Sequence, residues 1–129
     1  MRKLLILIII SLLFSSGCAL MVPNEPTDRQ ITNDTKKIAE NFMKSIVGED
    51  KNPKDYLKLI ETKTSGMVKE ENYAIAYIQT EYEVLKTFDE KILWLIPKTH
   101  QKGEYLIRKY LLTYLKTDKG WILKEHKDR

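Results

Sequence analysis

The chain has 129 residues, with 22 Lys and Arg against 18 Asp and Glu, 43% apolar residues, one Cys and two His. This length accommodates one domain at most, and the balance of apolar and charged residues is that of a folding sequence. A single Cys excludes an intrachain disulfide framework, and two isolated His leave little for a protein-only metal site. We therefore expect no resident metal or cofactor.

Residues 1–17 have the three parts of a secretory signal peptide. Arg2 and Lys3 precede an apolar run over residues 4–14, and small residues follow it. The run is shorter than the about 20 residues that a membrane span requires. The sequence therefore predicts export, with the basic N-terminus on the cytoplasmic side. The alternative is an uncleaved anchor over residues 4–22, which places the following domain on the same side of the membrane.

The end of this segment carries a more specific pattern. The stretch Phe14-Ser15-Ser16-Gly17-Cys18 resembles the lipobox of bacterial lipoproteins, and Ser15 stands where that family usually has Leu. The resemblance implies that the Cys18 thiol receives a diacylglyceryl group and that cleavage after Gly17 makes Cys18 the new N-terminus. Two acyl chains hold a protein firmly, because each buried CH₂ contributes about 0.8 kcal/mol to membrane binding. We expect a lipid-anchored protein on the extracytoplasmic face of a bacterial cell membrane.

Charge and composition indicate how the remainder of the chain is divided. Loss of residues 1–17 would leave 20 positive against 18 negative side chains, which gives no support to nucleic-acid binding. Pro23 and Pro26 lie among polar residues and predict a short tether. We therefore divide the chain into a signal peptide (1–17), a lipidated Cys with its tether (18–30) and a single extracytoplasmic domain (31–129).

The domain opens with a helical pattern. Residues 33–35 are candidate N-caps, apolar residues from Ile38 to Ile46 recur on one helical face, and Gly48 is a suitable end. A second short helix is predicted from Asn52-Pro53 to residues 64–66, with Tyr56, Leu57 and Ile60 on its buried face. Residues 67–85 fit either a helix or a strand. We favour a helical turn near 66–72 and a strand from Ala74 onward.

The pattern beyond residue 85 is that of β-structure. It comprises a short apolar strand at 91–96, a polar loop at 97–103, a long strand at 104–116, a turn at 117–120 and a closing strand at 121–125. Consecutive strands joined by short turns form an antiparallel sheet. Helices followed by strands predict an α+β fold, with the N-terminal helices packed on a sheet of about four strands.

The first helix and the last hairpin resemble those of the nuclear-transport-factor-2-like (cystatin-like) fold. The helix is residues 37–50, and the hairpin is residues 110–124, in which a strand and a polar turn with Gly precede Trp121 and alternating apolar residues. In that fold, N-terminal helices pack into the concave face of a curved antiparallel sheet, and small Gram-positive lipoproteins of unknown function contain it. The superfamily includes isomerases, dehydratases, ligand binders and scaffold domains of secretion and conjugation machines. The resemblance therefore implies a fold and no single function.

Few residues suggest catalysis. The sequence has no Gly-rich phosphate loop, Gly-x-Ser-x-Gly elbow, His-Glu-x-x-His or Cys-x-x-Cys motif. We expect His100, in the predicted polar loop, and His126, in a charged tail, to be solvated surface side chains. Glu81 and Glu83 would share one face of a strand. A carboxylate pair in a pocket could do acid–base work, but a wet face is the more frequent reason for such a pair.

The aromatic residues gather in the β half, and four of them are candidates for a ligand or partner surface: Tyr82, Trp94, Tyr110 and Tyr114. On the long strand, the two Tyr share one face with Leu112. The other face carries Ile107, Leu111 and Leu115. One face of the sheet must pack against the helices. The other face would then expose an apolar patch of the kind that marks partner or ligand surfaces. The alternatives are a bulge near Lys109 and simple filling of the core.

Three functions remain open on these grounds. The first is a binding or interaction module that docks a protein partner or a second copy through its sheet. The second is a small-ligand carrier or an enzyme that uses the pocket of the fold. The third is a structural component of an envelope secretion or conjugation apparatus. All three attach to the membrane through lipid on Cys18, and we lean against catalysis.

Overall fold

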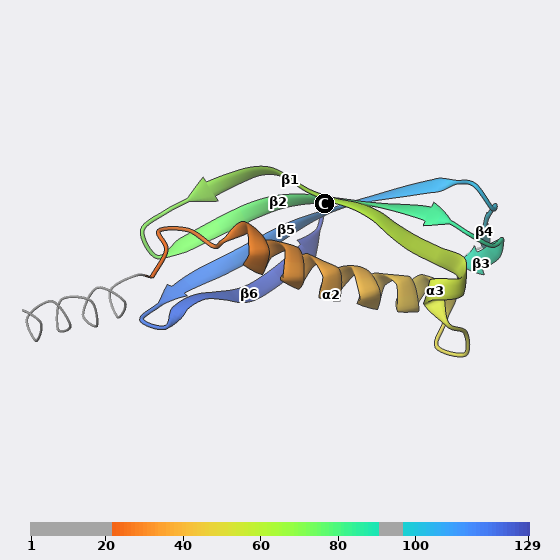
Figure 1. Cartoon of the computed structure of the whole chain (residues 1–129), viewed down its shortest axis with the longest axis horizontal. Helices are drawn as coiled ribbons and strands as arrows, with labels where there is room; N and C mark the ends of the chain where they lie inside the picture. Colours follow the sequence, from red (N-terminus) through yellow and green to blue (C-terminus); the bar gives the residue numbers. More distant parts are fainter. Residues whose placement is uncertain (1–21, 91–96) are drawn as a thin grey trace, which may run out of the picture.

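The computed structural model describes residues 22–90 and 97–129 (Figure 1). Gly17, Cys18, Trp94 and the strand predicted at 91–96 lie outside the described residues. The described elements, in chain order, are α2 (Asp28–Val47), α3 (Pro53–Tyr56), β1 (Leu57–Lys69), β2 (Tyr73–Val84), β3 (Phe88–Glu90), β4 (Lys98–His100), β5 (Tyr105–Thr117) and β6 (Gly120–Asp128).

The predicted α+β class is confirmed. A four-stranded sheet has the order β1-β2-β5-β6 with every neighbouring pair antiparallel, and β3 and β4 form a separate two-stranded sheet. The long helix α2 crosses one face of the larger sheet, and no described helix covers the other face (Figure 1). The β1–β2 and β5–β6 hairpins lie at the end of the sheet where α2 begins. The small sheet and α3 lie at the opposite end (Figure 1).

Helix α2 begins earlier than the sequence predicts. The Thr27 side chain accepts a hydrogen bond from the Gln30 backbone N–H at 3.2 Å, so Thr27 is the N-cap. Ile31 and Thr35 then extend the buried face of the helix. The caps predicted at 33–35 are therefore wrong, and the helix includes residues assigned to the tether. The predicted end is confirmed, because Gly48 adopts a φ of 104° there and its N–H donates to the Lys44 carbonyl.

The core lies between α2 and the sheet and has two parts along the helix. One part, near the start of α2, joins Ile31 and Ile38 to residues of β2, β5 and β6. The other, near its end, joins Met43 and Val47 to residues of β1, β2 and β3. Ala74 and Ala76 of β2 are fully buried and belong to the first of these two parts.

The predicted second helix is mostly wrong. It ends at Tyr56, and Leu57 begins strand β1. The pairing of β1 with β2 skips Ile60, which is an extra residue in the ladder and is 41% exposed. This bulge gives the sequence a spacing that imitates a buried helical face. The helical turn predicted near 66–72 is also wrong, because β1 continues to Lys69. The strand predicted from Ala74 is confirmed as β2.

The C-terminal half follows its prediction with two differences. The long strand and the closing hairpin are confirmed as β5 and β6, although β6 continues to Asp128. The predicted loop at 97–103 instead contains β4, whose residues pair with Phe88–Glu90. The β2–β5 ladder runs without a shift through Lys109, so the alternative of a bulge at that position is wrong.

Candidate functional site

A polar groove of about 460 Å³ lies between α2 and the inner face of the sheet. A larger depression, of about 920 Å³, lies over the loop that follows α2, but its lining residues carry none of the buried polar groups described below. The groove is therefore the candidate site. Its polar lining comes from α2, β3, β5 and β6 and comprises Asn41, Ser45, Glu90, Arg108, Tyr110, His126 and Asp128.

Arg108 is the cation in this lining. Its Nη2 lies 2.8 Å from Oδ2 of Asp128, and its guanidinium carbon lies 4.8 Å from the centre of the Phe42 ring. Strand pairing explains the first contact, because Asp128 of β6 lies opposite Tyr110 of β5, two residues from Arg108. Both partners are more than a third exposed, so the ion pair contributes little to stability. The remaining guanidinium N–H groups leave Arg108 with donors for a ligand.

Tyr110 provides a buried hydroxyl. The residue is 2% exposed, and its hydroxyl has no hydrogen-bond partner among the described residues. The neighbouring Tyr82 hydroxyl is also buried and also lacks a hydrogen-bond partner among the described residues. Burial raises the pKa of Tyr82, and the neighbouring Tyr110 adds to the effect, whereas Thr80 and Arg108 oppose it. A buried hydroxyl without a partner costs about 1–3 kcal/mol, so a ligand atom that accepts its hydrogen bond would be stabilised here.

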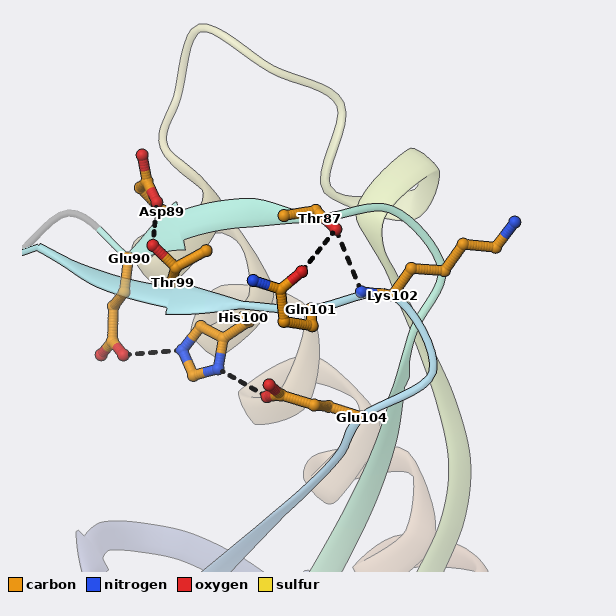
Figure 2. A network of polar contacts seen from close by, with 8 residues as sticks. All are labelled: Thr87, Asp89, Glu90, Thr99, His100, Gln101, Lys102 and Glu104. Atoms are coloured by element: carbon orange, nitrogen blue, oxygen red, sulfur yellow. Dashed lines mark hydrogen bonds and ion pairs between the residues drawn. The ribbon is translucent and has the colours of Figure 1, made fainter.

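His100 links the groove to the small sheet. Figure 2 shows its ring between two carboxylates: Nε2 lies 2.9 Å from Oε2 of Glu90, and Nδ1 lies 3.5 Å from Oε2 of Glu104. The ring also packs against Phe88, with 5.1 Å between the ring centres. A neutral imidazole has one N–H to donate, whereas its protonated form has two and could serve both carboxylates. Glu90 itself lines the groove, so the charge of this cluster acts on any ligand there.

The expectation that His100 is a solvated surface side chain is wrong. The residue is 3% exposed, because Lys98–His100 pairs with Phe88–Glu90 and turns the imidazole toward the core. Two further contacts hold this small sheet together (Figure 2): Thr99 Oγ1 donates to Asp89 at 2.6 Å, and the Lys102 N–H donates to Thr87 at 3.1 Å. His126 is exposed, as predicted.

Nucleophilic catalysis has little support in the groove. Ser45 supplies a hydroxyl, but this hydroxyl donates to the Phe42 carbonyl oxygen at 2.7 Å, within its own helix. A nucleophile needs a base within hydrogen-bond reach, and the described residues show no contact of that kind at Ser45. The described residues contain no cluster of three or more His, Cys, Asp or Glu able to hold a metal ion.

Glu81 and Glu83 lie away from the groove. Thr80, Tyr82 and Val84 take the inner side of β2, so the residues between them face the opposite side. There Glu81 lies between Glu61 of β1 and Ile107 of β5. Both residues are half-buried there, and neither carboxylate lines the groove.

The prediction of an aromatic ligand or partner surface is wrong for Tyr82 and Tyr114. Tyr82 and Tyr114 are fully buried beneath α2, and only Tyr110 of the three reaches the groove. The Tyr114 hydroxyl donates to Oδ2 of Asp34 at 2.9 Å. Burial, followed by this hydrogen bond, raises the pKa of Tyr114. Tyr82 and Tyr114 therefore fill the core, and Trp94 lies outside the described residues.

The outer face of the sheet does expose apolar side chains, as the alternation of β5 predicts. Ile107 is 54% exposed and Leu115 is 36% exposed, whereas Leu111 between them is half-buried. The other exposed large hydrophobic residues are Ile60, Val68, Tyr73, Tyr105 and Ile122. An apolar surface of this kind is typical of a docking face.

Sequence reasoning missed Glu90, Arg108 and Asp128. They lie on three different strands, and only the pairing of β5 with β6 and the position of β3 bring them to one groove. One signal was present in the sequence. Arg108 precedes Tyr110 by two residues, so both belong to the same face of a strand whose other members there are apolar.

Comparison with known proteins gives little further guidance. No family model matches the chain, and no curated protein matches it. Among solved structures, it is similar to the intermembrane space region of the chloroplast protein ARC6, with a TM-score of 0.37 and 13% identity over 85% of this chain and 76% of that one. A similarity this weak does not indicate a function. Among the described residues, no helix is both long enough and apolar enough to cross a membrane.

Proposed function

We propose that this chain is a membrane-anchored extracytoplasmic lipoprotein that acts as a binding module. The observation that carries the proposal is the sequence Ser15-Ser16-Gly17-Cys18 after a basic and apolar start, with the chain's single Cys at the position of lipid attachment. In this proposal, cleavage follows Gly17, Cys18 carries the acyl chains, and the domain lies outside the cytoplasm. The exposed apolar residues on the outer face of its sheet support a binding role.

We infer in addition that the domain belongs to the nuclear-transport-factor-2-like class. The support is architectural: a long N-terminal helix lies across one face of an antiparallel sheet, and the chain ends in a hairpin that buries Trp121. This class would be compatible with binding, catalysis or scaffolding, so the proposed function does not depend on it.

Metabolic labelling tests the anchor. The full-length chain is expressed in a bacterium supplied with alkyne-palmitate, and label is detected on the purified protein. We expect label on the wild type and none on Cys18→Ser. Ser15→Leu is the matched control, because it restores the residue usual in lipoboxes and should keep the label. An unlabelled wild type, or equal labelling of Cys18→Ser, would contradict the proposal.

Photo-crosslinking tests the binding role. A photoreactive amino acid replaces Ile107 on the outer face, and a control replaces Lys44, an exposed residue on α2. We expect a defined crosslinked partner from position 107 and none from position 44. A second copy of the chain would identify a homodimer, and a component of a secretion or conjugation apparatus would assign the domain to that machine. Crosslinks of equal pattern from both positions would contradict a docking face.

A second candidate function is the binding of a small polar ligand in the groove. The Tyr110 hydroxyl favours it, because this buried group lacks a partner and lines the groove beside Arg108. Together these two residues offer donors to a ligand oxygen, whereas Glu90 and Asp128 offer acceptors. The suited ligand is therefore a small molecule that carries both hydroxyl or carboxylate oxygens and a donor group.

Native mass spectrometry of residues 18–129 tests this second function. A bound small molecule should appear with the wild type and be lost or weakened in Tyr110→Phe, which removes only the hydroxyl. Tyr105→Phe, on the exposed outer face, is the matched control and should retain the ligand. A ligand that persists equally in Tyr110→Phe would show that the groove hydroxyl does not bind it.

A further inference from the structure

The start of the described chain is fixed to one end of the sheet. The Trp121 indole N–H donates to the Pro23 carbonyl at 2.9 Å, and the Gln30 side-chain amide donates to the Trp121 carbonyl at 2.7 Å. Pro26, between these contacts, is buried. The segment predicted as a short tether is therefore attached to the sheet from Pro23 onward, beside the β5–β6 hairpin (Figure 1).

This attachment leaves a short connection to Cys18. Four residues lie between Cys18 and Pro23, and the five Cα–Cα steps that join them span at most about 18 Å when the chain is fully extended. Strand β2 has 12 residues and a length of about 40 Å. The reach of the connection is thus less than half the length of the sheet. Lipid on Cys18 would hold the hairpin end of the domain close to the bilayer, and this step rests on the proposed function.

The same end of the sheet exposes apolar side chains on its outer face. Tyr73, Leu115 and Ile122 lie directly across β2, β5 and β6 in one row of the ladder. Their exposed fractions are 42%, 36% and 55%, and Val68 in the next row is 45% exposed. We call these four residues the hairpin patch. Lys63, Gln79 and Lys109 form a polar row that separates it from Tyr105 and Ile107 at the opposite end.

The hairpin patch suits the boundary between lipid headgroups and acyl chains. Tyr73 is amphipathic, and Tyr is enriched at that depth of the bilayer. The charges of the adjoining hairpin tips nearly balance, with Lys69 and Lys119 beside Glu70, Glu71 and Asp118. Contact with a bilayer therefore does not require anionic lipid. A patch of four side chains is small, so the anchor at Cys18 supplies the local concentration that it needs.

We propose that the hairpin patch rests on the surface of the membrane to which Cys18 attaches the chain. In this orientation the hairpin end lies against the bilayer, and the far end, with the small sheet, lies away from it. Glu90 and His100 are at that far end, so the groove faces the extracytoplasmic space. The occupant of the patch is thus the lipid surface, and a soluble ligand reaches the groove from the opposite side.

Depth-dependent fluorescence quenching tests this orientation. Residues 18–129 are coupled through the single Cys to a maleimide lipid in phosphatidylcholine vesicles that contain brominated acyl chains. Tyr73→Trp reports from the hairpin patch, and Tyr105→Trp is the matched control, because Tyr105 is exposed on the same face at the far end. Trp94 and Trp121 are common to both variants. Denaturation of the uncoupled variants verifies that both fold.

We expect the emission maximum of the Trp introduced by Tyr73→Trp to move to shorter wavelength and its intensity to be quenched by the bromines. The Trp introduced by Tyr105→Trp should show neither change. Equal quenching at the two positions, quenching only at 105, or none at either would overturn the proposal. A crosslinked dimer through position 122 would assign the patch to a second copy and also overturn it. Chemical coupling makes this result independent of cellular acylation, so failure here is distinct from failure of the palmitate labelling.

Discussion

The two faces of the four-stranded sheet differ sharply although they are made of the same strands. On β2, alternate residues from Ala74 to Val84 are at most 1% exposed, and on the other side of that strand Tyr73 is 42% exposed. Helix α2 accounts for the difference, because it covers one face and leaves the other to solvent or a partner. The buried inner face therefore contributes most of the stability of the sheet, whereas the exposed side chains of the outer face contribute little.

The largest expected difference in stability between the two faces is between two Leu→Ala substitutions on β5. Leu112→Ala removes a fully buried side chain beneath α2 and should cost about 2–5 kcal/mol of unfolding free energy. Leu115→Ala removes a side chain that is 36% exposed on the outer face and should cost about 1 kcal/mol or less. Urea denaturation measures both. Equal losses would mean that something in solution also covers the outer face.

Alkaline pH should lower the unfolding free energy through two tyrosines of the inner face. The pKa values of Tyr82 and Tyr114 are raised in the folded state, chiefly by burial, from the ordinary value of 10.0. The unfolded chain therefore loses these protons first as the pH rises. The stability they contribute is complete below about pH 10 and is lost as the pH climbs toward the folded pKa values.

Each of the two tyrosines should lower the unfolding free energy by about 1.4 kcal/mol per pH unit in that window. Urea titrations at about pH 8 and about pH 11 measure the slope. Tyr114→Phe should reduce it, and Tyr105→Phe, on the outer face, should not. An unchanged slope in Tyr114→Phe would contradict the assigned cause.

The N-terminal end of α2 gives a smaller effect. Thr27→Ala removes the side chain that accepts from the Gln30 N–H and should cost about 1 kcal/mol. Thr27→Asn, which preserves a capping oxygen, should cost little. Thermal unfolding compares the two variants. If both were equally destabilised, the role of Thr27 would lie in packing and not in capping.

The smallest effect belongs to the outer carboxylates. Glu81→Gln and Glu83→Gln should each change the unfolding free energy by no more than about 0.5 kcal/mol, because both residues lie half-buried on the outer side of β2, away from the groove. Neither should alter any ligand seen by native mass spectrometry. Loss of such a ligand in Glu81→Gln would place its site on the outer face.

The sequence predicted the elements whose pattern is local. The sequence predicts the body of α2, the β2 strand and the β5–β6 hairpin, because the hydrophobic periodicity and the turn residues of each lie within one short stretch of the chain. The predicted second helix failed at Ile60, where a bulge in β1 shifts the alternation of the strand. No local pattern distinguishes such a bulge from the spacing of a helical face.

The candidate site was less accessible from sequence. Glu81 and Glu83 were a visible pair, but the face of β2 that α2 covers decides their position, and that choice depends on the whole core. His100 was expected in a loop, because a pairing of three residues with β3 is too short to leave a pattern. The groove itself depends on contacts between distant strands.

The most direct test of the central claim is the intact mass of the protein recovered from bacterial membranes. The proposal predicts a membrane-bound chain that begins at Cys18 and is heavier than its residues by a diacylglyceryl group. Cys18→Ser should lack that added mass. A chain of full length from Met1, or one that begins at Cys18 without lipid, would contradict the proposed anchor.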